Sequence, residues 1–195
     1  MFQKVLFPTD FGRLTSHLLV CLGDLRKVGL KEVVIVNVIN TDQLDHDILA
    51  SFRNQHEARL REISRIKMDE QIQTLKNTNI KPKGVIKEGI VSNEIAKIAE
   101  SEDVSLIIFG IQYEKRDEDR LNTLISQVIY KTKIPVLVIK LTEEEIKYPE
   151  ECARFCTNLF SKVLFPTDWS ECAEAALEQA ERYTLRKENL KPHFS

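Results

Sequence analysis

The sequence predicts an α/β protein with one open, parallel, five-stranded sheet and helices on both faces. Short runs rich in β-branched residues alternate with segments whose apolar residues recur at helical spacing, which is typical of consecutive βαβ units. The second of these runs is apolar almost throughout, as in a parallel strand that is buried on both faces. Five such strands and four helices in about 140 residues match one domain of typical size.

The first strand is predicted from a stretch that occurs twice. The letters KVLFPTD at residues 4–10 return unchanged at residues 162–168, an offset of 158 residues. In each copy an apolar run comes first, and proline ends it because proline has no N–H for a sheet ladder. Threonine and aspartate follow as natural helix N-caps. Each copy therefore predicts a buried strand, a tight turn and a helix start.

The first helix and the second strand follow directly. Residues 33–39 form a nearly continuous β-branched run, which predicts a buried parallel strand. Before it, Gly29 provides the C-terminal stop of a helix. The apolar residues that give this helix one common face are Leu14, Leu18, Cys21, Leu22, Leu25 and Val28.

A long polar helix is predicted from about Leu44 to Lys76. Charged residues fill most of it, and we interpret them as a solvated face. Its length suggests either a break or a helix that partly stands off the sheet. Its sparse apolar stripe consists of Leu49, Phe52, Leu60, Ile63 and Ile66.

The third strand is predicted to be short, at residues 85–87. Glu88 and Gly89 turn the chain, and Ser92 or Asn93 caps the next helix. The residues of this helix that we expect to face inward are Ile95, Ile98 and Ala99.

The last two strands are predicted at residues 105–110 and 135–139. A charged loop at residues 114–120 and one helix connect them. The apolar residues of that helix are Leu121, Leu124, Ile125, Val128 and Ile129.

Four short signatures make residues 1–141 resemble the universal stress protein (UspA) family. Each is weak alone, but together they stand in the expected order: FPTD at 7–10, KEG at 87–89, DVSLIIFG at 103–110 and KIPVLVIK at 133–140. The resemblance implies an adenine nucleotide alpha hydrolase-like fold with strand order 3-2-1-4-5. It also implies a stress-response role.

The chain divides into three parts on this reading. Residues 1–141 form the universal stress protein domain, and residues 142–160 form an acidic, helical linker. Residues 161–195 start a second repeat with one strand and one helix, which cannot bury a core alone. This tail docks on its own sheet edge, swaps into a partner chain or stays partly disordered.

A candidate ligand site follows from the strand order. Ligands of open α/β sheets bind beyond the carboxyl ends of strands where the order reverses, here between the first and fourth strands. Thr9 and Asp10 line one side of this crevice, Gly110 the other, and Val38 lies nearby. Asp10 can accept hydrogen bonds from a ribose or a base, or it can simply cap the first helix.

The glycine motif of nucleotide-binding relatives is almost absent. The resemblance implies Gly, two residues, Gly, nine residues, Gly and Ser or Thr after the fourth strand. This sequence has Gly110, Tyr113, Thr123 and Leu124 at those positions, so the backbone cradle for phosphates is lost. The loop that follows is acidic, but its Lys115 and Arg116 are possible phosphate contacts.

Composition argues against several other classes of protein. The net charge of −2 and a pI of about 6.1 make nucleic acid and anionic membranes poor partners, since both select basic patches. No apolar stretch approaches the roughly 20 residues of a membrane span, and no signal peptide precedes the first strand, so we expect a cytoplasmic protein.

Cysteines and histidines give little support to catalysis or to a resident metal. Cys152 and Cys156 share a helical face, which is either a thiol pair or soft-metal site or, in our interpretation, ordinary reduced packing. The other cysteines and the histidines are Cys21, Cys172, His17, His46, His56 and His193, and they match no zinc spacing. No Ser-His-acid arrangement with a nucleophile elbow is present either.

Three functional readings remain. The first is a non-enzymatic stress-response or signalling module that forms a homodimer through the edge strand with Ile134, Val136 and Val138. The second is an ATP or AMP sensor that uses magnesium and a rebuilt phosphate loop, with or without weak hydrolysis. The third is an electron-transfer or adenylating relative, by analogy of fold alone.

Overall fold

The structure is a computed structural model of the 195-residue chain. It describes residues 2–40, 50–76, 78–112 and 118–141, together with residues 168–171, 173, 174 and 177. The acidic linker at residues 142–160 therefore lies outside the described residues, as do the side chains of all four cysteines.

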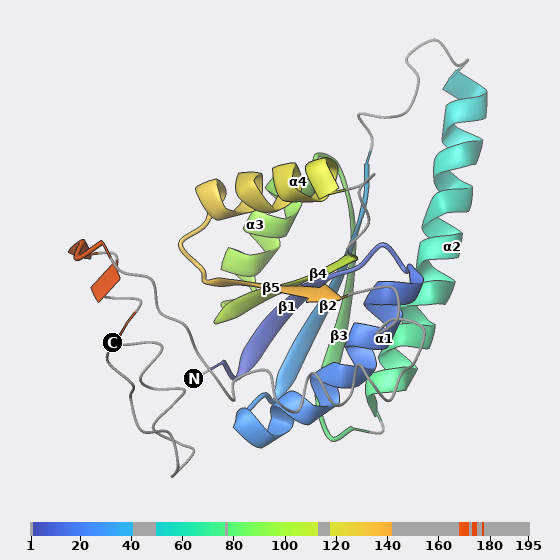
Figure 1. The fold of residues 1–195 in the computed structure, drawn as a ribbon. Helices are drawn as coiled ribbons and strands as arrows, with labels where there is room; N and C mark the ends of the chain where they lie inside the picture. The colour runs from blue at the N-terminus through green and yellow to red at the C-terminus, as the bar shows by residue number, and fades with distance from the viewer. Residues whose placement is uncertain are drawn as a thin grey trace.

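Five strands and four α-helices alternate along the described part of the first 141 residues (Figure 1). The elements are β1 (Lys4–Pro8), α1 (Arg13–Leu22), a 3-10 segment (Gly23–Val28), β2 (Glu32–Ile39), α2 (Ala50–Lys76), β3 (Lys81–Glu88), α3 (Val91–Ser101), β4 (Leu106–Gln112), α4 (Glu118–Lys131) and β5 (Val136–Leu141). The predicted α/β class is confirmed.

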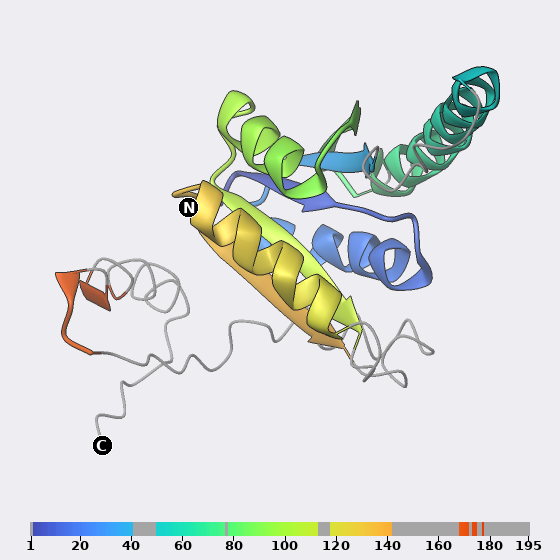
Figure 2. The same ribbon diagram turned by 90° about the horizontal axis from the view of Figure 1, so that it is seen from above.

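The strands form one sheet in the order β3-β2-β1-β4-β5, and every neighbouring pair is parallel. This confirms the predicted order 3-2-1-4-5. Figure 2 shows the sheet between its two helical layers, with α3 and α4 on one face and α1 and α2 on the other.

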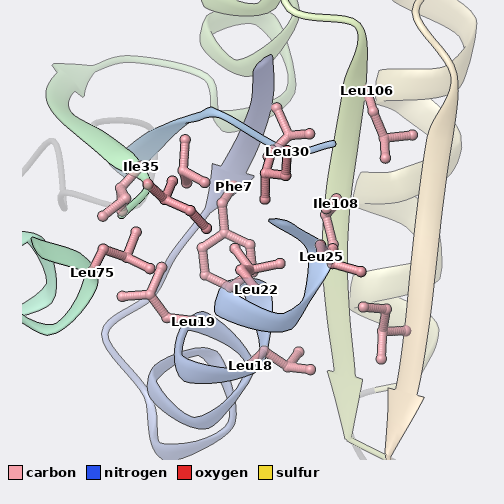
Figure 3. Close-up of a cluster of buried hydrophobic side chains, with 14 of the residues drawn as sticks. Phe7, Leu18, Leu19, Leu22, Leu25, Leu30, Ile35, Leu75, Leu106 and Ile108 are labelled. Atoms are coloured by element: carbon pink, nitrogen blue, oxygen red, sulfur yellow. The ribbon is translucent and has the colours of Figure 1, made fainter. Parts of the chain in front are cut away.

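Two apolar cores lie on the two faces because successive side chains of a strand point in opposite directions. Phe7 packs on the α1 and α2 side, where it is surrounded by leucines of α1 (Figure 3). Leu6 packs on the α3 and α4 side, against Ile95, Ile98 and Ala99, which are buried as predicted. Both Phe7 and Leu6 are 0% exposed, which explains the continuous apolar runs of the inner strands.

Helix α2 contacts the sheet through a different stripe from the predicted one. Its buried residues are Ser64, Met68, Gln71 and Leu75, and they recur at helical spacing. Ile63 is 40% exposed and Ile66 is 47% exposed, so the prediction that they form the inner stripe is wrong. The helix is one unbroken element, and its N-terminal part rises past the ends of the strands (Figure 1).

Two element boundaries also differ from the predictions. Strand β3 is longer than predicted because Lys81 to Glu88 pair with β2 over its full length. Helix α3 begins at Val91 after Ile90, without a side-chain cap, so neither Ser92 nor Asn93 is the N-cap. Gly29 does end the first helical segment, with a φ of 99° that glycine adopts without strain.

Candidate functional site

The turn after β1 is held against β2 by backbone hydrogen bonds. Thr9 N donates to the carbonyl of Val36 at 2.8 Å, which extends the β1–β2 ladder by one bond. Asn37 Nδ2 donates to the carbonyl of Thr9, also at 2.8 Å. Asn37 is 9% exposed and is the one polar residue inside the apolar run of β2, so its role is to fix this turn.

The hydroxyl of Thr9 is buried and points toward the helices α1 and α2. It accepts hydrogen bonds from Phe11 N at 3.0 Å and from Gln71 Nε2 at 3.1 Å. It donates to the hydroxyl of Thr15 at 3.3 Å. The predicted site residue Thr9 is therefore in place, but its side chain is engaged inside the protein.

Asp10 is exposed at the end of β1, and one of its carboxylate oxygens closes the turn. Asp10 Oδ1 accepts from Gly12 N at 2.7 Å and from the Thr15 hydroxyl at 2.9 Å. Phe11 between them has a φ of 60°, in the left-handed region. The capping role considered for Asp10 is thus present as a turn that leads into α1.

A chain of hydrogen bonds connects the buried face of α2 to Asp10 at the surface. Gln71 donates to Thr9, Thr9 donates to Thr15, and Thr15 donates to Asp10. Gln71 and Thr9 are 62 positions apart in the sequence, which is why local patterns did not reveal this partnership. The polar character of Asn37 within an apolar strand was a signal that sequence reasoning missed.

Gly110 and Val38 lie on opposite faces of the sheet. A Cβ atom on Gly110 would collide with Leu18 Cδ1, so this glycine allows α1 to pack closely against β4. Val38 is partly buried in the core on the α3 and α4 side. The structure brings Thr9 and Asp10 together in one turn, but it gives Gly110 and Val38 packing roles.

The strands separate where the strand order reverses. Strand β1 pairs with β2 up to Pro8 and Val36, whereas the pairing of β1 with β4 is confined to Val5 and Leu6. Asp10 lies at this carboxyl end, as predicted. Tyr113, Lys115 and Arg116 lie outside the described residues.

An ion pair joins the long helix α2 to the sheet at the carboxyl-terminal end of its strands. Arg61 of α2 bonds to the carboxylate of Glu88 at the end of β3, and this contact lowers the pKa of Glu88. At the other end of the sheet, Glu102 binds Lys83 at 2.6 Å and Lys4 at 3.0 Å, and these bonds lower the pKa of Glu102. These three ion pairs connect elements of the fold to one another.

The second copy of the repeated stretch forms the same turn. Asp168 Oδ1 accepts from Ser170 N at 3.0 Å, and Trp169 has a φ of 61°. Glu174 N then donates to the carbonyl of Ser170 at 3.0 Å, as Ser16 N does to Gly12 at 3.1 Å. The tail therefore repeats the local structure of residues 10–16 where it is described.

Within the described residues, no group of three or more histidine, cysteine, aspartate or glutamate side chains is placed to hold a metal ion. In the same part of the chain, no helix combines the length and apolar character needed to cross a membrane.

Comparison with known proteins places this geometry in a family. The sequence profile of the universal stress protein family matches residues 1–140. The universal stress protein MJ0577 of Methanocaldococcus jannaschii is 30% identical over 155 residues, which cover 72% of this chain and 96% of that protein. A solved structure of the MJ0577 protein matches with a TM-score of 0.62 over 73% of this chain and 99% of that chain.

Two further structures share the fold. A universal stress protein of Archaeoglobus fulgidus is 26% identical and matches 95% of this chain and 63% of its own, with a TM-score of 0.71. A universal stress protein solved in complex with cAMP matches 71% of this chain and 97% of its own, with 13% identity and a TM-score of 0.51. With its sheet order, repeated turn and matched profile, the chain belongs to the universal stress protein family.

Proposed function

We propose that this chain is a non-enzymatic stress-response or signalling module that acts through homodimerisation and binds no ATP. Membership of the universal stress protein family supports the stress-response role. One observation carries the finer proposal: of the four positions of the family's glycine motif, only that of Gly110 keeps its glycine.

The loss of the glycine motif removes the backbone cradle that a triphosphate needs. Small residues let backbone N–H groups approach phosphate oxygens, and Tyr113 stands where such a residue belongs. Leu124 replaces the Ser or Thr that ends the motif, and it packs partly buried in the α3 and α4 core. The loop at residues 114–120 has four acidic and three basic side chains, which is unfavourable for a polyanion.

The internal bonds of Thr9 and Asp10 support the same conclusion. The Thr9 hydroxyl is 3.0–3.3 Å from three partners of its own chain, and Asp10 Oδ1 holds the turn. Both side chains therefore have a structural role that needs no ligand.

The edge strand β5 is our candidate dimer interface. It has β4 as its only strand neighbour in the described sheet, so it is an edge strand there, the kind of strand that pairs with a second chain. Val138 is 39% exposed on this strand, while Val136 is partly buried. Ile134 precedes the strand, which begins at Val136, so we now place the pairing segment at Val136–Leu141. Two copies would meet there across a two-fold axis.

A second candidate function is an ATP or AMP sensor with magnesium. Asp10 favours it, since this carboxylate is exposed beyond the end of β1 and its hydrogen bonds to other described residues are made by Oδ1, not by Oδ2. A structure of the same fold holds cAMP. Lys115 and Arg116 are the cations that would replace the glycine cradle.

Native mass spectrometry with and without ATP and magnesium tests these alternatives. We expect a dimer that carries no nucleotide at millimolar ATP. One bound nucleotide per chain would refute the loss of binding and favour the sensor. At the low protein concentration of this measurement, Val138→Glu should convert the dimer to monomer, and Val20→Glu, at an exposed valine of α1, is the matched control that should leave it intact.

For the tail we propose that residues 161–195 pack on a sheet edge or on a partner chain, because one strand and one helix cannot bury a core. Deleting residues 161–195 should therefore change the oligomeric state or lower the melting temperature. An unchanged assembly with an unchanged melting temperature would contradict this proposal.

A further inference from the structure

Helix α2 carries an apolar patch on the side that faces away from the sheet. Ile63 and Ile66 are 40% and 47% exposed, and they are neighbours one turn apart. Ile66 lies two positions from both Ser64 and Met68, which are buried. Since each residue turns a helix by about 100°, Ile66 points almost directly away from the core.

Two charged residues flank this patch at equal distances. Arg59 stands four positions before Ile63, and Glu70 stands four positions after Ile66. Spacings of four residues keep both charges on the side of the helix that carries the isoleucines.

Most other charges of α2 have ion-pair partners in the described part of the chain, and these two do not. Arg61 pairs with Glu57 and with Glu88. Arg65 pairs with Glu62 at 2.8 Å and with Asp69 at 3.7 Å. Among the described residues, the side chains of Arg59 and Glu70 make no ion pair.

The order Arg59, Ile63, Ile66, Glu70 is complementary to itself when it is reversed. If a second α2 lies antiparallel with its centre between the two isoleucines, Ile63 faces Ile66 and Arg59 faces Glu70, and each contact occurs twice. The charged pairs then lie about 8 Å along the helix axis on either side of the centre, at 1.5 Å per residue. We propose that this face of α2 binds the α2 of a second copy of this chain.

A second copy fits this face better than an unrelated partner does. An isologous contact requires one patch that complements itself, and the reversed charge order meets that requirement. Ile63 and Ile66 are both exposed among the described residues, so a second helix has access to them. A contact between two helices is small, so we expect weak, concentration-dependent association.

This contact is independent of the proposed β5 interface. Two different two-fold contacts on one chain build a closed tetramer or a longer assembly. Val138→Glu removes the β5 contact and leaves α2 unchanged. Sedimentation of that variant over a range of protein concentrations therefore measures the α2 contact without the β5 contact, and the charge variants below identify the α2 part of the association.

A charge exchange between two variants tests the proposal. Arg59→Glu and Glu70→Arg, each in the Val138→Glu background, place like charges opposite each other in both pairs. Each variant alone should associate at least about tenfold more weakly than its parent. An equimolar mixture of the two should recover the association, because the mixed dimer has one original pair and one reversed pair.

Matched controls separate this contact from an effect of net charge. Arg65→Glu makes the same charge change on another side of the helix, where Arg65 forms ion pairs within its own chain. It should weaken association less than twofold, and Glu70→Arg should enter mixed dimers with it more weakly than it does with Arg59→Glu, because one of the two pairs still has like charges. The proposal is wrong if the parent remains monomeric at all concentrations, if Arg65→Glu weakens association as much as Arg59→Glu does, or if the reversed mixture stays dissociated. Unchanged melting temperatures would show that the variants are folded.

Discussion

The repeated stretch forms one turn in two environments. In the first copy, Phe11 is half-buried against the α1 and α2 core, and Lys67 Nζ lies 5.9 Å from the centre of its ring. In the second copy, Trp169 occupies the same position with nearly the same φ but is 84% exposed.

The two copies separate the local causes of the turn from the tertiary contacts that bury its aromatic side chain. The hydrogen bond from the third residue of the turn back to the aspartate is present in both copies, at 2.7 Å for Asp10 and 3.0 Å for Asp168. The turn therefore follows from a few adjacent residues, as Asx turns do. Burial of the aromatic side chain requires helix α2, which is supplied by residues far away in the sequence.

The largest expected difference between the copies concerns their phenylalanines. Phe7→Ala should lower the free energy of unfolding by about 3–5 kcal/mol, because Phe7 is 0% exposed at the centre of a leucine-lined core. Phe165→Ala makes the same change in the second copy and should cost less, since the tail cannot build a complete core. Urea unfolding of both variants measures the difference, and equal losses would mean that both copies are packed to the same degree.

Much of the fold could be predicted because the apolar residues of the strands repeat at short range. The helix α2 shows where that reasoning fails. Its inner face includes the polar residues Ser64 and Gln71, so counting apolar residues selected Ile63 and Ile66 on the wrong side. The inner face is possible because Gly84 of β3 has no side chain where Met68 and Ile72 approach.

The candidate site, like the fold, could be predicted only where the signal lies in adjacent residues. Turn chemistry identified Thr9 and Asp10, since proline, threonine and aspartate after a strand are local signals. The role of Gly110 was not predictable, because the atom that requires a glycine there belongs to Leu18, almost a hundred residues earlier. Gln71 likewise reaches Thr9 only after the helix has packed on the sheet.

A smaller effect is expected when the hydroxyl network of the first copy is removed. Thr9→Val leaves Phe11 N and Gln71 Nε2 without their acceptor in a buried position. Unsatisfied buried groups cost about 1–3 kcal/mol, so the free energy of unfolding should fall by that amount. Thr167→Val is the matched change in the second copy, and we expect it to be nearly neutral. Chemical denaturation of both variants provides the comparison, and a neutral Thr9→Val would show that the network contributes nothing.

Exchanging the third residue of the two turns should have a smaller effect still. A Cβ atom on Gly12 would lie 2.8 Å from Asp10 Oδ1, so Gly12→Ser forces the carboxylate to move. Serine already occupies this position in the second turn, where the amide-to-carboxylate bond is 3.0 Å. We expect a loss of about 0.5–1 kcal/mol for Gly12→Ser and little change for Ser170→Gly. Thermal unfolding of the pair tests this, and a gain in stability for Gly12→Ser would contradict it.

The smallest effect concerns the pH dependence of the second turn. Hydrogen bonds from the hydroxyl and the amide of Ser170 hold the pKa of Asp168 below its usual value. The folded turn thus favours the charged carboxylate, so its contribution is complete above the ordinary aspartate pKa of about 3.9 and is lost as the pH falls through the lower folded pKa.

An NMR titration of the Asp168 carboxyl carbon measures this pKa directly. Ser170→Ala removes the hydroxyl and keeps the backbone amide, so the pKa of Asp168 should rise toward its ordinary value while the Ser170-to-Asp168 backbone bond remains. If the pKa does not move, the hydroxyl is not the main cause and the backbone amide holds the charge alone. Either result shows how far the local sequence Pro166–Ser170 determines this turn without contacts from the rest of the fold.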